Sequence, residues 1–160
     1  MLTLTNDDKS VLHKIWTLTT SPDNGVLARG TEDTSIAEAL GLPLSVVRSS
    51  VQFLKELGLA SFVRQSSDPD ALGCVQVTDE GQVGAAQLSD GFDDAVHAVR
   101  GVLLADDSTR MSGDIARAAD LEPRVVVAVL LFLESEYVRL SRMPSGVFVQ
   151  QLSEHLRRMS

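Results

Sequence analysis

Several features that are scarce in this sequence of 160 residues limit what the protein can be. Cys74 is the single cysteine, so it forms no disulfide within the chain and no thiolate metal site by itself, as suits a reducing compartment. We expect it to be a small buried hydrophobic side chain. Apolar runs stay well short of the roughly 20 residues that span a bilayer, and the first residues lack the pattern of a signal peptide. These absences predict a cytoplasmic protein without a membrane segment.

Basic residues are also scarce, since 14 Lys and Arg stand against 22 Asp and Glu, for a net charge of -8. Affinity for nucleic acid depends largely on cations that displace counterions from phosphates, so this balance argues against a simple polyanion binder. Residues 1–88 carry 6 basic and 11 acidic side chains, and residues 89–160 carry 8 and 11. Neither half is basic, and any basic surface must be local.

The sequence lacks the arrangements that are typical of active sites and cofactor sites. Its three histidines, His13, His97 and His155, each fall within a predicted helix, and no nucleophile motif accompanies them. Neither a dinucleotide-binding glycine pattern nor a phosphate-binding loop occurs. We therefore expect no catalytic residue, no metal site and no cofactor, and we expect that the protein is not an enzyme.

An internal repeat with an offset of 79 residues organises the chain. The segment from Ile36 to Leu42 aligns without a gap on the segment from Ile115 to Leu121. The apolar skeleton continues in the same register, because Val47, Val51, Phe53, Leu54 and Leu59 meet Val126, Leu130, Phe132, Leu133 and Val138. Such agreement over two helices and a turn predicts two related domains, residues 1–88 and 89–160.

Each copy reads as three helices followed by a hairpin. In the first copy, capping residues and apolar spacing predict helices over 6–19, 32–40 and 43–57, strands over 59–64 and 74–77, and a loop over 65–73. In the second copy they predict helices over 93–105, 111–119 and 123–137, a turn at 144–146 and a C-terminal helix to about 159. Residues 82–92 are expected to form a helix that leaves the first copy as a linker.

The order helix, helix, turn, helix, hairpin resembles the winged helix-turn-helix superfamily. Two segments carry the resemblance, Phe53–Leu59 and Val75–Gly81, and similar segments occur in regulators of the multiple-antibiotic-resistance type. The resemblance implies a mainly α fold with small β-hairpin wings (α+β) and two tandem winged-helix domains. It also implies that the third helix enters the major groove of DNA and that the wing touches the backbone. Such a resemblance marks the fold better than the function.

The third helix of the first copy has a polar outward face. Helical periodicity turns Val47, Val51 and Leu54 toward the core, which leaves a face able to hydrogen-bond base edges or phosphates. An ordinary solvated helix surface explains the same pattern equally well. The candidate DNA contacts are Ser45, Arg48, Ser49, Gln52, Lys55 and, in the wing, Arg64.

The third helix of the second copy is apolar all round, which is typical of a helix that is covered on both sides. Its outward positions include Arg124, Val127, Ala128 and Leu131. Burying a Val or Leu contributes about 1.5–3 kcal/mol, so we expect another surface to cover them. The cover could be a second copy, the chain's own first domain or the C-terminal helix around Leu156, and we favour a homodimer through the second domain.

Two hypotheses of function follow. The first is a regulator that reads DNA with its first domain and dimerises through its second, with a small-ligand-responsive repressor as a variant. The second is a non-catalytic protein-interaction module without DNA binding, since an acidic tandem pair is similar in plan to the kleisin-binding subunit of bacterial condensin complexes.

Overall fold

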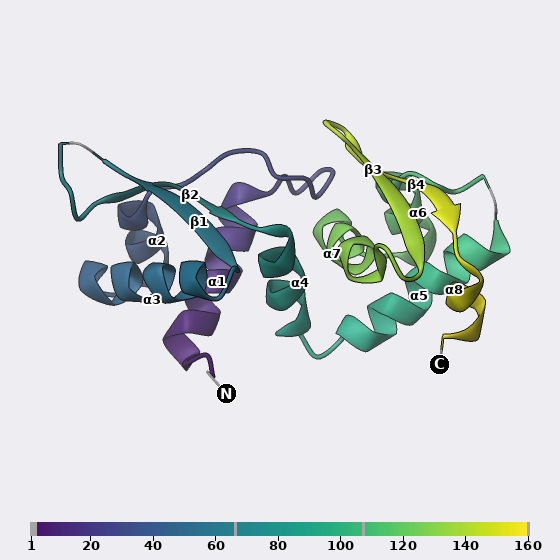
Figure 1. The fold of residues 1–160 in the computed structure, drawn as a ribbon, viewed down its shortest axis with the longest axis horizontal. Coiled ribbons are helices and arrows are strands. Elements are labelled where there is room, and N and C mark those ends of the chain that lie inside the picture. The colour runs from purple at the N-terminus through teal and green to yellow at the C-terminus, as the bar shows by residue number, and fades with distance from the viewer. Residues whose placement is uncertain (1–2, 66, 107, 160) are drawn as a thin grey trace. The chain divides into compact units, whose positions relative to one another are not determined.

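The computed structural model describes residues 3–65, 67–106 and 108–159. The chain divides into two compact units (Figure 1). Unit 1 contains the chain up to Thr20 and Leu27–Leu88, and unit 2 contains Ser21–Val26 and the chain from Ser89 onward. The division falls at the expected boundary, but the sequence did not indicate that the short segment Ser21–Val26 groups with unit 2.

Unit 1 begins with three helices, α1 (Asn6–Thr19), α2 (Asp33–Leu40) and α3 (Leu44–Glu56). A capping box starts α1, because the Asp8 N–H donates to the Thr5 hydroxyl and the Thr5 N–H donates to the Asp8 carboxylate. Gly41 ends α2 with a φ of +65°, in the left-handed region that favours glycine. These three helices lie within one or two residues of the predicted ranges.

Two antiparallel strands follow in unit 1, β1 (Ala60–Arg64) and β2 (Leu72–Val77). The register shifts between Ser61 and Val63, which is the mark of a β-bulge, and Val75 also pairs with Thr31. Of the predicted loop 65–73, residues 65 and 67–71 lie between the strands, whereas Leu72 and Gly73 belong to β2; position 66 is outside the described residues. The prediction that Cys74 is buried is wrong: it lies in the irregular part of β2 with a φ of +50°, and its side chain is exposed.

Helix α4 (Asp79–Gln87) closes unit 1, and the Thr78 hydroxyl caps it by accepting from the Gly81 N–H. It begins three residues before the predicted range 82–92 and ends before that range does. The core of unit 1 is built from fully or almost fully buried side chains of α1, α2, α3 and β2: Val11, Leu12, Ile15, Trp16, Ile36, Val47, Val51, Leu54, Leu72 and Val75.

Unit 2 repeats this order with α5 (Phe92–Ala105), α6 (Ser112–Ala119), α7 (Pro123–Leu133), β3 (Val138–Met143), β4 (Gly146–Leu152) and a short α8 (Glu154–Arg158). Strands β3 and β4 are antiparallel. Phe92 and Phe132 meet edge to face with ring centroids 5.3 Å apart. Leu103, Ile115, Leu130, Leu133 and Val149 lie in the core with no exposed surface.

Helix α7 ends four residues before the predicted limit of Tyr137. The residue with positive φ that follows the third helix is Gly58 in unit 1, with a φ of +80°, and Ser135 in unit 2, with a φ of +73°. The Tyr137 N–H then donates to the Leu133 carbonyl, and the Ser135 N–H donates to the Val138 carbonyl. Periodicity did not reveal this early stop, because the apolar pattern continues through the turn.

Over the described residues the fold is mixed, with eight helices and two small antiparallel hairpins. The predicted α+β class is therefore confirmed. Within the same ranges, no helix is both long enough and apolar enough to cross a membrane.

We predict that Gly81→Ala destabilises unit 1 strongly. A Cβ at this position would lie 1.9 Å from the Leu59 carbonyl oxygen, and that oxygen belongs to backbone. Overpacking of this kind costs about 1–3 kcal/mol or more. Gly84→Ala in the same helix is the matched control, because its Cβ would meet only side chains at 3.7 Å and alanine favours helix. Urea unfolding should show a lower midpoint for the first variant and an equal or higher one for the second. Equal midpoints would contradict the packing described for α4.

Candidate functional site

Helix α3 has one buried and one accessible face, as predicted. Val47, Val51 and Leu54 are fully buried. On the other side Ser45 and Ser49 are exposed and Gln52 is half-buried. This face is the one on which the sequence predicted contacts to DNA.

Arg48 is held by a buried carboxylate. Its Nε donates to Asp33 Oδ2 at 2.7 Å, and the side chain of Asp33 is only 3% exposed. The same carboxylate oxygen accepts from the Leu72 N–H at 2.9 Å. Asp33 is the first residue of α2, where the helix dipole favours negative charge. One carboxylate therefore joins α2, α3 and the second strand of the hairpin.

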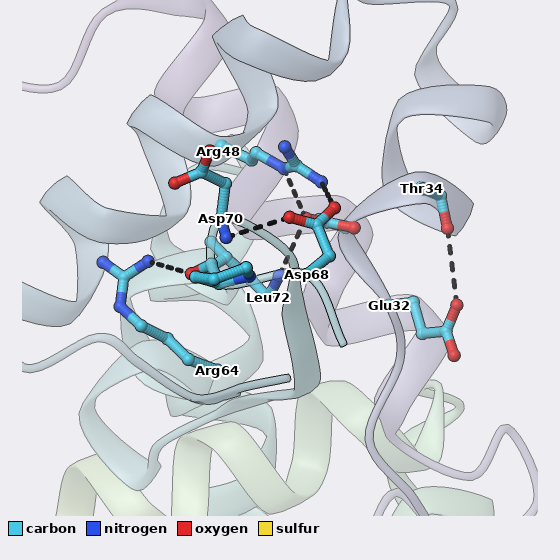
Figure 2. Close-up of polar contacts among 9 residues, drawn as sticks. Glu32, Thr34, Arg48, Arg64, Asp68, Asp70 and Leu72 are labelled. Atoms are coloured by element: carbon cyan, nitrogen blue, oxygen red, sulfur yellow. Dashed lines mark hydrogen bonds and ion pairs between the residues drawn. The ribbon is translucent and has the colours of Figure 1, made fainter. Parts of the chain in front are cut away.

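The hairpin loop adds more negative charge beside Arg48. Asp68 Oδ2 lies 3.6 Å from Arg48 Nη2, and the Asp70 N–H donates to Asp68 Oδ1 at 3.1 Å (Figure 2). The hydrogen bond that Arg48 donates to Asp33 raises the pKa of Arg48, and the charges of Asp33, Asp68 and Asp70 raise it further, against a smaller effect of burial. Arg48 is therefore engaged within unit 1 and lies beside carboxylates.

The other two predicted cations flank an aromatic ring. Lys55 Nζ lies 4.3 Å and Arg64 Cζ 5.6 Å from the centroid of Phe62. Arg64 also donates from Nη1 to the Pro69 carbonyl at 3.2 Å (Figure 2). Both side chains are exposed. They lie at the end of α3 and on β1, and the structure pairs neither of them with Ser45 or Ser49.

A hollow of about 460 Å³ lies between α3 and the start of α1, and Ser45 and Ser49 of the accessible face line it. Two carboxylates from α1 face it, together with hydroxyl groups and two apolar side chains. Asp7 is exposed there, whereas Asp8 is buried and accepts from Ser50 Oγ at 2.7 Å. The lining residues are Thr5, Asp7, Asp8, Ser45, Val46, Ser49, Ser50 and Phe53.

Hydrogen bonding sets the pKa of Asp8. Burial by itself raises the pKa of this carboxyl, but the hydrogen bond from Ser50 and those involving Thr5 together outweigh burial, so the pKa lies below its usual value. Asp8 is thus an anion fixed between α1 and α3.

Carboxylates outnumber cations around this face. The three cations predicted there are Arg48, Lys55 and Arg64, whereas five acids among the described residues line the hollow or act on Arg48: Asp7, Asp8, Asp33, Asp68 and Asp70. Sequence reasoning missed the role of these acids because caps and loops are the usual places for Asp. The spacing of 15 residues between Asp33 and Arg48 carries no periodic signal.

The candidate interface residues of unit 2 are buried or half-buried. Val127 is 2% exposed and Ala128 is fully buried within the single chain, while Arg124 and Leu131 are half-buried. Val127 and Ala128 are thus covered by the chain itself, which is one of the covers that the sequence left open. The homodimer through unit 2 stays a prediction.

The histidines do not form a site. His13, His97 and His155 are all exposed, and His13 contacts the edge of Trp16 with ring centroids 5.7 Å apart. In the ranges that the structure describes, no group of three or more His, Cys, Asp or Glu residues is placed to hold a metal ion.

No protein-family model matches the chain, and neither a curated protein nor a solved structure is significantly similar to it. The geometry of the two units is therefore the basis for assigning a function.

We predict that Asp33→Ala destabilises the protein. The substitution leaves the buried Leu72 amide without its acceptor, which costs about 1–3 kcal/mol, and it also removes the partner of Arg48. Asp68→Ala is the control, because it removes only the exposed member of the group. Chemical denaturation should separate the two variants clearly. If they unfold at the same denaturant concentration, Asp33 does not join the three elements as described.

We also predict that Asp8 contributes a stability that depends on pH. Since its pKa in the folded state is lowered, the contribution is complete above its unfolded pKa of about 3.9 and is lost as pH falls through the folded pKa. The free energy of unfolding of Asp8→Asn should therefore fall less on acidification than that of the wild type. Asp7→Asn, at the exposed neighbour, is the control. Identical acid profiles for wild type and Asp8→Asn would contradict this role.

Proposed function

We propose that the chain is a tandem winged-helix protein that acts by binding another protein through unit 1, without catalysis and without reading DNA. The fold assignment rests on the repeated order of three helices and a hairpin, and on the accessible outward face of α3. This is the face that winged-helix proteins commonly present to a ligand. The plan resembles the kleisin-binding subunit of bacterial condensin complexes, and a cytoplasmic location belongs to the same proposal.

The main support is electrostatic. Arg48, the cation central to α3, is engaged with Asp33 and lies beside Asp68. Its Nε is bound to a buried carboxylate, so turning the guanidinium away from Asp33 onto a phosphate would weaken that pair, which is unfavourable. The remaining cations, Lys55 and Arg64, are too few to offset the carboxylates along the face. A duplex would therefore gain little from docking there.

The hollow beside α3 favours a protein ligand. Val46 and Phe53 supply apolar surface, Ser45 and Ser49 supply hydroxyl groups, and Asp7 supplies an exposed negative charge. A partner segment with a Lys or Arg next to an apolar side chain complements this combination. We therefore propose a partner that presents such a cationic segment.

DNA binding is the second candidate, because Ser45, Ser49 and Lys55 are exposed on α3 and Arg64 is exposed on the wing. It predicts salt-dependent binding at low ionic strength, with a dissociation constant of about 10⁻⁴–10⁻⁶ M or tighter even for non-specific sequence. A direct titration with duplex DNA therefore distinguishes the two candidates.

We predict that fluorescence anisotropy of a labelled genomic duplex at low salt shows no binding, and that the tagged chain retains a specific protein from cells of its source. Ser49→Arg adds bulk and positive charge at the hollow and should abolish that retention. Gln87→Arg, which adds the same side chain at an exposed position of α4, should leave it intact.

The retained protein, once purified, should bind the wild type with a measurable heat of association and bind Ser49→Arg at least about tenfold more weakly. Duplex binding that weakens as salt rises would contradict the proposal and favour the DNA candidate. Equal retention by Ser49→Arg and Gln87→Arg would show that the α3 face is not the binding surface.

A further inference from the structure

A groove in unit 2 differs in character from the α3 face of unit 1. It lies between the end of α7 and the hairpin, with a volume of about 720 Å³, within the range of pockets that hold ligands. Apolar side chains contribute to its lining, and Arg139 and Gln151 are exposed beside them. Its apolar members are Leu131, Val138, Leu140 and Leu152.

One edge of the hairpin is open along this groove. Strand β3 pairs with β4, and the other side of β4 is engaged because the Val149 N–H donates to the Arg110 carbonyl at 2.9 Å. Among the described residues, the outer side of β3 is paired only at its first residue, where Val138 forms a bridge with Glu134 and accepts from the Ser135 N–H; no strand pairs with the rest of this edge. An open edge of this kind can accept an extended segment as an additional strand.

The charges at this edge determine which kind of segment it can bind. Glu134 is neutralised by Arg142, whose two terminal nitrogens lie 2.8 and 3.1 Å from its carboxylate oxygens. Arg139 is exposed and forms no ion pair with any described residue. Among the residues that line the groove, the uncompensated charge is therefore positive.

A second copy of the chain does not suit this edge. In an antiparallel pairing of two β3 strands about their centre, Arg139 of each copy would lie opposite Arg142 of the other. Like charges directly opposite each other destabilise a strand pair. In this register the edge therefore disfavours self-association, and Arg139 favours a segment of the opposite charge.

We propose that the groove and the outer edge of β3 bind an extended acidic segment of another protein, in which apolar residues alternate with Asp or Glu. The backbone of the segment pairs with β3, its apolar side chains lie against Leu131 and Leu140, and one carboxylate meets Arg139. This surface is separate from the α3 face proposed above and takes a ligand of opposite charge.

The test is a titration of the full-length, isotope-labelled chain with two synthetic peptides, followed by amide NMR shifts. One peptide alternates valine with glutamate, and the other alternates valine with lysine. The acidic peptide should give saturable shifts at the amides of β3 and around Leu131, and the basic peptide should give none. Arg139→Glu should weaken binding of the acidic peptide by at least about tenfold.

Arg158→Glu is the matched control, because it makes the same charge change at an exposed position of α8 in the same unit. It should bind the acidic peptide as the wild type does. The proposal is overturned if neither peptide shifts β3 up to about 1 mM, a concentration that corresponds to about -4 kcal/mol. It is also overturned if both peptides bind equally, or if the two arginine variants lose binding equally.

Discussion

The arrangement of unit 1 depends on one buried carboxylate. Asp33 accepts from Arg48 on α3 and from the Leu72 amide on β2, so three elements that are distant in sequence share one anion. Because a buried charge is tolerated only when it is paired and hydrogen-bonded, neither donor can leave without a large penalty. The cation most central to α3 is therefore engaged in holding unit 1 together, and for this reason we propose a protein partner rather than DNA.

The two units share a skeleton and differ in what surrounds it. In unit 1 the face of α3 is polar and bordered by carboxylates, with a hollow that suits a cationic partner segment. In unit 2 the corresponding positions Val127 and Ala128 are buried, and the accessible feature is a groove beside an open strand edge that carries Arg139. We propose on this basis that the two units bind partner segments of opposite charge.

Much of the fold could be predicted from sequence, because local rules determine it. The apolar spacing of α1 and α3, the glycine after α2 and the offset of 79 residues locate most elements within a few residues. Local rules failed where tertiary contacts decide. The end of α7 depends on a turn at Ser135 with positive φ, and the exposure of Cys74 depends on an irregular strand pairing. For the site, the sequence predicted only the accessible face of α3, on which Ser45 and Ser49 are exposed. It did not predict the pairing of Arg48 with Asp33, because that contact is non-local and has no sequence signature.

The most direct test of this account is the NMR signal of the Arg48 side-chain Nε–H in the intact protein. If Arg48 is held by Asp33, this signal should be resolved, slow to exchange with solvent and unshifted when duplex DNA is added at low salt. A signal that exchanges rapidly with solvent, or that shifts in proportion to added duplex, would show that Arg48 is available to a phosphate and would contradict the central claim.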